Sequence, residues 1–147
     1  MTKVLGEVQT KNSISIRTSI IGHEISLPKV GLLEWFLKKR TIYGFNKAYF
    51  SGLTVLQFSK ILENTNFFYN LSGIYHLSSK KISKYDLLNK IKKIYKKKTI
   101  ITKSNSFKID RSLNSNKIKN KIKINIPSWR QMIEETYNFE KNESKYN

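Results

Sequence analysis

Arg111 is the residue whose chemistry follows most directly from its type, because a guanidinium group binds phosphate through two parallel hydrogen bonds. It lies in segment 110–115, where the amide of Asn114 and the hydroxyl of Ser115 could add neutral hydrogen bonds to the same ligand. A second interpretation fits the same residues: Arg111 pairs with Asp110 at the surface, and Asn114 and Ser115 close a turn. The sequence therefore indicates a candidate anion-binding segment at 110–115 and leaves the surface loop open.

His23 and Glu24 form a second candidate group, because they directly follow segment 13–22, which reads as a strand and its closing turn. Ligands of α/β folds gather at the carboxyl ends of strands, so both side chains could contact a substrate there. A polar loop is the other interpretation. The second histidine, His76, lies inside another strand-like segment, where we expect a structural role. Two histidines this far apart, without any cysteine, give little support for a metal site.

Phe50 and Ser51 are candidates for contact with a flat heterocycle such as a nucleobase, since an aromatic ring and open backbone groups suit one. Other aromatic side chains fall on the apolar stripes of predicted helices, and we expect them in the core. They are Trp35, Phe36, Trp129 and Tyr137.

The size and composition of the chain fit one domain or a piece of one. It has 147 residues, of which 39% are hydrophobic, enough for a modest core. No apolar run approaches the ~20 residues that span a bilayer, and the N-terminus lacks the apolar core of a signal peptide. Cysteine is absent, which suits a reducing compartment. We therefore expect a cytoplasmic protein without a membrane partner.

The net charge of +18 allows two interpretations. It could attract nucleic acid or anionic lipid, or it could reflect A/T-rich codons, since Lys, Ile, Asn, Tyr and Phe are all abundant. The densest lysine stretch, 80–98, could form a basic stripe interleaved with Tyr75, Tyr85 and Tyr95, as in a small basic nucleic-acid-binding protein. These tyrosines also fit core positions, and the sequence contains no nucleic-acid-binding motif. We therefore expect only nonspecific nucleic-acid binding and keep that class of protein as the alternative function.

Short strand-like and helix-like segments alternate along the chain, which predicts an α/β fold. The strands are expected at 13–19, 41–45, 73–78 and 99–102, and the helices at 2–9, at 30–40, after Thr54, from Ser83 and from Ser128, with mostly loop at 103–121. The strands are few and short, and no Gly-x-Gly-x-x-Gly loop is present. The pattern therefore predicts a domain without a central sheet of its own.

Six segments in order resemble one family, the extended short-chain dehydrogenases, in particular those similar to dTDP-4-dehydrorhamnose reductase. They are 2–7, 15–22, the group 44–45 with 50–54 and 73–78, 82–87, 110–115 and 127–129. The resemblance implies an α/β fold that is a C-terminal substrate-binding lobe with the last strands of a Rossmann-type sheet and an incomplete dinucleotide-binding half. It divides the chain into 1–22 (the end of the Rossmann-type half), 23–139 (the substrate-binding lobe) and 140–147 (a frayed tail).

In this family a Tyr-x-x-x-Lys motif supplies the proton for ketone reduction. The resemblance places Lys3 at the lysine of that motif, where it would favour the ionised tyrosine and bind the nicotinamide ribose. An ordinary N-terminal lysine is the other interpretation. The tyrosine would then stand before Met1, and the Gly-rich dinucleotide loop further upstream. NADP or NAD is the cofactor of the full-length family, and we expect neither to bind this chain alone.

The function implied by the resemblance is binding of a nucleotide sugar, dTDP- or UDP-linked, within an NAD(P)-dependent 4-keto-sugar-nucleotide reductase of surface-polysaccharide sugar biosynthesis. Arg111 would hold the diphosphate. The other substrate contacts would be Asn114, Ser115, His23, Glu24, Phe50 and Ser51. The chain would be inactive alone, and a complementary N-terminal chain is a candidate partner. A decayed remnant without function is a third interpretation, against which the preserved apolar periodicity argues.

Overall fold

The computed structural model describes residues 6–143 except 9, 26, 65 and 67. Its elements are β1 (Ile14–Arg17), β2 (Ile20–Ile21), α2 (Leu32–Leu37), β3 (Thr41–Phe50), β4 (Leu53–Thr54), α3 (Val55–Glu63), β5 (Gly73–His76), β6 (Ile82–Ser83), α4 (Lys84–Ile94), β7 (Ile100–Asp110), α5 (Asn116–Lys119) and α6 (Trp129–Glu143). The alternation of short strands and helices confirms the α/β prediction. The expected helix at 2–9 lies largely outside the described residues.

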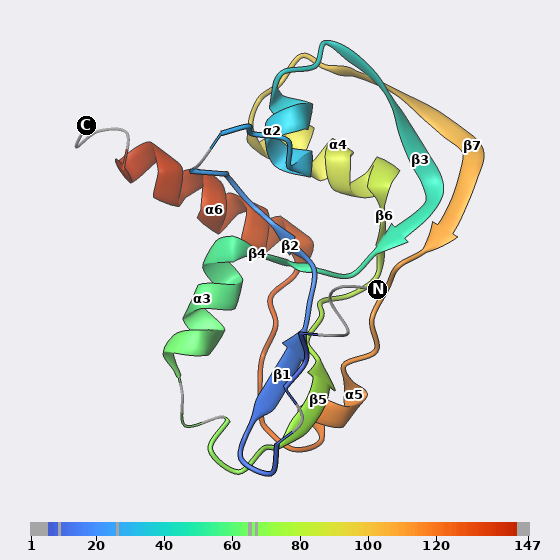
Figure 1. Cartoon of the computed structure of the whole chain (residues 1–147). Helices are drawn as coiled ribbons and strands as arrows, with labels where there is room; N and C mark the ends of the chain where they lie inside the picture. The colour runs from blue at the N-terminus through green and yellow to red at the C-terminus, as the bar shows by residue number, and fades with distance from the viewer. Residues whose placement is uncertain (1–5, 9, 26, 65, 67, 144–147) are drawn as a thin grey trace.

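The strands form three small sheets. β1 pairs with β5 and β2 pairs with β4, both in parallel, while β3 lies between β6 and β7 in the order β6-β3-β7. Within the described part of the chain, no sheet has more than three strands. This agrees with the few and short strands expected from the sequence. Figure 1 shows β1 and β5 with α5 at one end of the molecule, and α2 and α4 at the other.

β3 and β7 are much longer than the sequence predicts. They pair in parallel from Thr41 opposite Ile100 to Tyr49 opposite Asp110, with an irregularity between Phe45 and Lys47. They form a curved ribbon beside α4 (Figure 1). β7 is exposed along most of its length, and its residues 102–106 are all polar. The predicted loop from residue 103 is therefore wrong up to Asp110. An exposed edge strand need not alternate apolar and polar residues, so the sequence pattern does not indicate it.

Three helices begin at the side-chain caps that the sequence predicts. The hydroxyl oxygens of Thr54 and Ser83 accept hydrogen bonds from backbone N–H groups in the first turns of α3 and α4. At α6, the backbone N–H of Ser128 donates to the Gln131 side chain and the Gln131 N–H donates back to the Ser128 hydroxyl. α6 also continues to Glu143, past the expected start of fraying at Glu140.

The core lies where α4 meets β3 and α6. Leu87, Leu88 and Ile91 of α4 are at most 2% exposed. Burying each such side chain stabilises the fold by roughly 1.5–3 kcal/mol. Phe36 and Trp129 are buried as predicted, whereas Trp35 is 37% exposed, because α2 turns that side chain away from the core. Among the described residues, no helix is long and apolar enough to cross a membrane.

Candidate functional site

The carboxyl ends of three parallel-paired strands, β3, β5 and β7, meet at one place. After β7, the backbone N–H of Arg111 donates to the carbonyl of Tyr49 at 3.2 Å, and that of Leu113 donates to the Ser51 hydroxyl at 2.7 Å. After β5, the backbone N–H of Ser79 donates to the carbonyl of Ser51 at 2.9 Å. We call residues 50–51, 78–79 and 111–115 the strand-end cluster. Such convergence of strand ends is where α/β folds gather ligands.

Buried hydroxyl groups fasten segment 111–115 to this cluster. The Ser78 hydroxyl donates to the carbonyl of Leu113 at 2.9 Å and lies 3.2 Å from the hydroxyl of Ser115. Ser51, Ser78 and Ser115 are each at most 5% exposed. The structure thus places Ser51 and Ser115 in the same cluster as Arg111, and their predicted contact with a substrate stays a prediction. Both hydroxyls form hydrogen bonds with protein groups, and these bonds hold segment 111–115 in its conformation.

The guanidinium group of Arg111 is exposed, and within the described residues it forms no ion pair or side-chain hydrogen bond. Its sequence neighbour Asp110 pairs instead with Lys81 and accepts two hydrogen bonds from Ser112. These contacts, the one with Lys81 foremost, lower the pKa of Asp110 to about 2. The Arg111–Asp110 ion pair considered from the sequence is therefore not formed, and the Arg111 side chain has its donors open to solvent.

Phe50 and Asn114 complete the predicted set at this place. The Phe50 ring is half-buried and packs on Trp129, with ring centroids 5.4 Å apart. Asn114 is exposed, and its side-chain oxygen accepts a hydrogen bond from the backbone N–H of Asn116 at 2.9 Å, which closes a local turn. The strand-end cluster therefore offers a fixed, buried base with exposed polar groups from segment 111–114.

His23 belongs to a different group of side chains. Its Nδ1 lies 2.7 Å from Oε1 of Glu34 on α2, and its Nε2 contacts Glu140 of α6. Tyr95, which ends α4, donates its hydroxyl proton to Glu140 at 3.0 Å and lies 3.4 Å from Nε2 of His23. We call these four residues the His23 cluster. It joins the loop after β2 to three helices.

The two carboxylates set the protonation of His23. The hydrogen bond to Glu140 raises the pKa of His23, burial opposes the rise, and the bond to Glu34 adds to it. For Glu34, burial acts to raise the pKa, but the bond from His23 and the charges of His23 and Lys29 outweigh it and lower the pKa. Burial, together with the negative charge of Glu140, raises the pKa of Tyr95 far above its ordinary value. The two carboxylates therefore favour the protonated form of the histidine that lies between them.

The structure separates the His23 cluster from the strand-end cluster. The two clusters lie at opposite ends of α4. Phe50 of the strand-end cluster pairs with Ile82, just before the N-cap Ser83, and Tyr95 of the His23 cluster is the C-cap. A helix of this length, about 16 Å, lies between the two places. Glu24 is used locally: its carboxylate accepts a hydrogen bond from the backbone N–H of Gly31 at 2.8 Å and closes the loop between them. No described contact joins His23 or Glu24 to Arg111.

Lys3 lies outside the described residues. The nearest described part of its segment contains an ion pair that the sequence did not point to. The carboxylate of Glu7 accepts two hydrogen bonds from Arg17 of β1, at 2.5 and 2.8 Å. This contact lowers the pKa of Glu7 and raises that of Arg17. The two residues stand ten positions apart with no periodic relation, so only their opposite charges could have suggested the pair.

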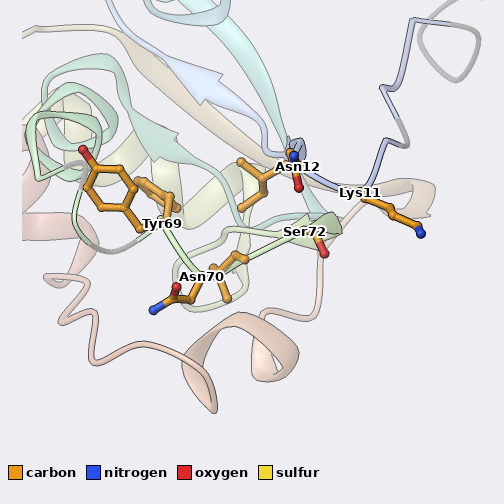
Figure 2. Close-up of a pocket in the computed structure, with 8 residues that line it drawn as sticks. Lys11, Asn12, Tyr69, Asn70 and Ser72 are labelled. Carbon is orange, nitrogen blue, oxygen red and sulfur yellow. The ribbon is translucent and has the colours of Figure 1, made fainter.

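An open hollow of about 590 Å³ lies at the amino ends of β1 and β5, opposite the carboxyl ends where the strand-end cluster lies. Figure 2 shows it, with Lys11 and Asn12 before β1 and Tyr69, Asn70 and Ser72 before β5. Its side chains do not converge on one point and belong to the amino ends of the strands. We therefore do not assign the functional site to this hollow. Among the described residues, no group of three side chains could hold a metal ion.

Comparison with solved structures identifies the fold. The dTDP-4-dehydrorhamnose reductase of Bacillus anthracis in complex with NADP matches 86% of this chain with a TM-score of 0.67 and 16% identity. A hypothetical dTDP-4-dehydrorhamnose reductase of Sulfolobus tokodaii matches 72% with a TM-score of 0.56 and 26% identity. A GDP-L-fucose synthetase of Naegleria fowleri bound to NADP matches 91% with a TM-score of 0.68 and 15% identity.

These matches cover only part of the solved chains: 48%, 38% and 46% of their respective lengths. No protein-family model matches the sequence, and no curated protein is significantly similar to it in sequence. The resemblance stated from the sequence is thus confirmed through the three-dimensional arrangement. The chain has the fold of part of the dTDP-4-dehydrorhamnose reductases and related short-chain-type sugar-nucleotide enzymes, over less than half of their length.

Proposed function

We propose that this chain is the nucleotide-sugar-binding portion of an NAD(P)-dependent 4-keto-sugar-nucleotide reductase, acting in the cytoplasm in the synthesis of surface-polysaccharide sugars. The observation that carries the proposal is the open guanidinium group of Arg111 at the joined ends of β3 and β7. It stands in a chain whose fold follows a dTDP-4-dehydrorhamnose reductase over 86% of its length. A nucleotide sugar presents a diphosphate, which an arginine binds with two parallel hydrogen bonds.

In this proposal residues 23–139 form the substrate lobe. Arg111 binds the diphosphate of a dTDP- or UDP-linked sugar, and the exposed Asn114 adds a hydrogen bond. Ser51 and Ser115 act as positioning residues, because their hydroxyls hold segment 111–115 in place. Contacts of Phe50 with the nucleobase, and of His23 and Glu24 with the sugar, stay predictions.

The cofactor half is proposed to come from another chain. The relatives from Bacillus anthracis and Naegleria fowleri are bound to NADP. The sequence has no Gly-x-Gly-x-x-Gly loop to hold a pyrophosphate at a helix start. At α3 and α4, one first-turn N–H group of each helix is already bonded, to Thr54 and Ser83 respectively. We therefore propose a complementary chain as partner, with Lys3 as a contact to the ribose in the assembled enzyme.

The isolated chain is expected to show no reductase activity. Mixed with NADPH and a dTDP-linked 4-keto sugar, it should consume NADPH no faster than buffer does, because it lacks a Gly-x-Gly-x-x-Gly loop to hold the hydride donor. The measurement is the loss of NADPH absorbance, with a complete dTDP-4-dehydrorhamnose reductase as the positive control. Turnover by the isolated chain would contradict this part of the proposal.

Replacing Arg111 by glutamine should weaken binding of a dTDP-sugar about tenfold to a hundredfold, which is the worth of a charge-assisted hydrogen-bonding pair. Isothermal titration calorimetry on the full chain measures it. Arg40→Gln is the matched control, because Arg40 is exposed after α2 and the substitution changes the net charge equally. The proposal fails if the two variants lose affinity to the same extent, or if the unaltered chain does not bind the dTDP-sugar.

A further inference from the structure

A continuous basic surface runs along the outer side of α4, and the function proposed above does not use it. It consists of three adjoining open hollows of about 710, 320 and 570 Å³. The cationic residues that line them are Lys80, Lys81, Lys90, Lys92, Lys93, Lys96, Lys97 and Arg130. We call this surface the α4 channel.

The three hollows are joined by shared residues. Lys90 and Arg130 line both the first and the second hollow, and Lys93 lines both the second and the third. The channel therefore follows α4 from the loop before β6 to the turn after Ile94. Eleven helical residues extend about 16 Å. The lysines are distributed along this whole length, so a single strand lying in the channel can contact several of them.

The acidic side chains in the channel are already bound. Glu134 accepts a hydrogen bond from Arg130 at 2.7 Å, and Asp86 accepts one from the Ser83 hydroxyl at 2.6 Å. The ammonium groups of Lys90 and Lys93, by contrast, have no ion pair or hydrogen bond with any residue that the structure describes. The same holds for Lys96 within that part of the chain. The channel therefore presents open positive charge.

We propose that the α4 channel binds single-stranded nucleic acid through its phosphate backbone, without sequence preference. A flexible single strand can follow linked hollows, whereas a flat membrane surface would touch only their rims. The side chains that a membrane would need are also elsewhere: the strongly exposed apolar Ile25, Leu27 and Val30 lie in the loop before α2. Tyr49 and Trp129 line the first hollow, but Lys81 covers the Tyr49 ring and Trp129 is buried, so base stacking contributes little.

The test uses the full chain and a fluorescent oligothymidylate of about 20 nucleotides, longer than the ~4–16 nucleotides that one compact site covers. Fluorescence anisotropy over a range of salt concentrations should give a slope of log K against log salt of about −3.5, if about five of the cationic side chains each contact one phosphate. Replacing Lys90, Lys93 and Lys96 together by glutamine should reduce the steepness of that slope by about 2 and weaken binding at least tenfold.

The matched control replaces Lys119, Lys121 and Lys123 by glutamine. All three are exposed, and Lys119 is the last residue of α5. Figure 1 shows α5 beside β5, at the other end of the molecule from α4. Both triple variants have the same net charge, so a loss confined to the α4 variant supports the channel. Equal losses would overturn the proposal in favour of general charge attraction, and absence of binding by the unaltered chain would also overturn it. Equally tight, equally salt-sensitive binding to anionic lipid vesicles would overturn it in favour of a lipid partner.

Discussion

Replacing Trp129 by alanine is expected to lower the free energy of unfolding by about 3–5 kcal/mol, the usual cost of deleting a buried tryptophan side chain. Trp129 is 5% exposed at the start of α6, and its ring packs on Phe50 at the end of β3. Its indole N–H donates to the carbonyl of Lys80 at 2.7 Å. The substitution therefore removes both the packing and the hydrogen bond that tie α6 to the strand-end cluster.

Urea unfolding followed by circular dichroism measures the effect of Trp129→Ala. Trp35→Ala is the matched control, because Trp35 is 37% exposed and its loss should cost less than about 1.5 kcal/mol. Trp129→Phe should fall between the two, since it keeps most of the ring volume but leaves the Lys80 carbonyl without its donor. Equal costs at the two tryptophan positions would show that α6 is not anchored in this way.

His23→Leu is expected to cost about 2 kcal/mol at about pH 6, less than the 3–5 kcal/mol of a fully buried pair because the His23 side chain is 33% exposed. The substitution leaves Glu34 and Glu140 facing each other without the positive charge between them. Glu135→Gln is the control, on α6, the helix that also carries Glu140. The ion pair of Glu135 with Lys60 is well exposed, and its loss should cost less than about 1 kcal/mol.

The cost of His23→Leu should depend on pH. Because the pKa of His23 is raised above its ordinary 6.5, its stabilising effect is complete below about pH 6.5 and is lost as the pH rises through the folded-state pKa. Because the pKa of Glu34 is lowered from 4.5, its effect is complete above about pH 4.5 and is lost as the pH falls through the folded-state pKa. The difference between the two proteins should therefore be greatest between these values.

Unfolding curves of both proteins between about pH 4 and 9 test this dependence. Lys29, Tyr95 and Tyr137 also face the cluster and stay unchanged in both proteins, so they cancel in the difference. Glu140→Gln should reproduce part of the effect, and the double variant should cost less than the sum of the two single ones. A difference between the proteins that stays constant over this range would rule out the protonated histidine.

The sequence predicted three helix starts and the two short strands β1 and β5. Thr54, Ser83 and Ser128 indicate helix starts, because a side-chain cap bonds to a backbone group only three residues away. The apolar residues Leu87, Leu88 and Ile91 repeat at the helical period, which is also a local signal. Only the start of β7 was predicted, at 99–102, because the exposed remainder of this edge strand needs no apolar pattern and its pairing with β3 depends on residues far away in the chain.

The candidate site shows the same division. Arg111 was predicted from its type and its place in segment 110–115, and the structure leaves its guanidinium group exposed, while its contact with a substrate stays a prediction. The His23 cluster could not be found, because Glu34, Tyr95 and Glu140 come from three helices and share no local motif with His23. The sequence predicted His23 as a substrate contact from its position after a strand alone, and that criterion does not detect partners brought in by tertiary packing.

The parallel pairing of β3 with β7 constrains the order in which the protein can complete its fold during synthesis. Thr41 pairs with Ile100, and α3 and α4 are made between them, so β3 must wait for its neighbour until the ribosome has released about sixty further residues. During that interval one long edge of β3 has no native partner and can pair with strands of other nascent chains. α6 is made last, so the Trp129 anchor closes the structure only after this vulnerable period has ended.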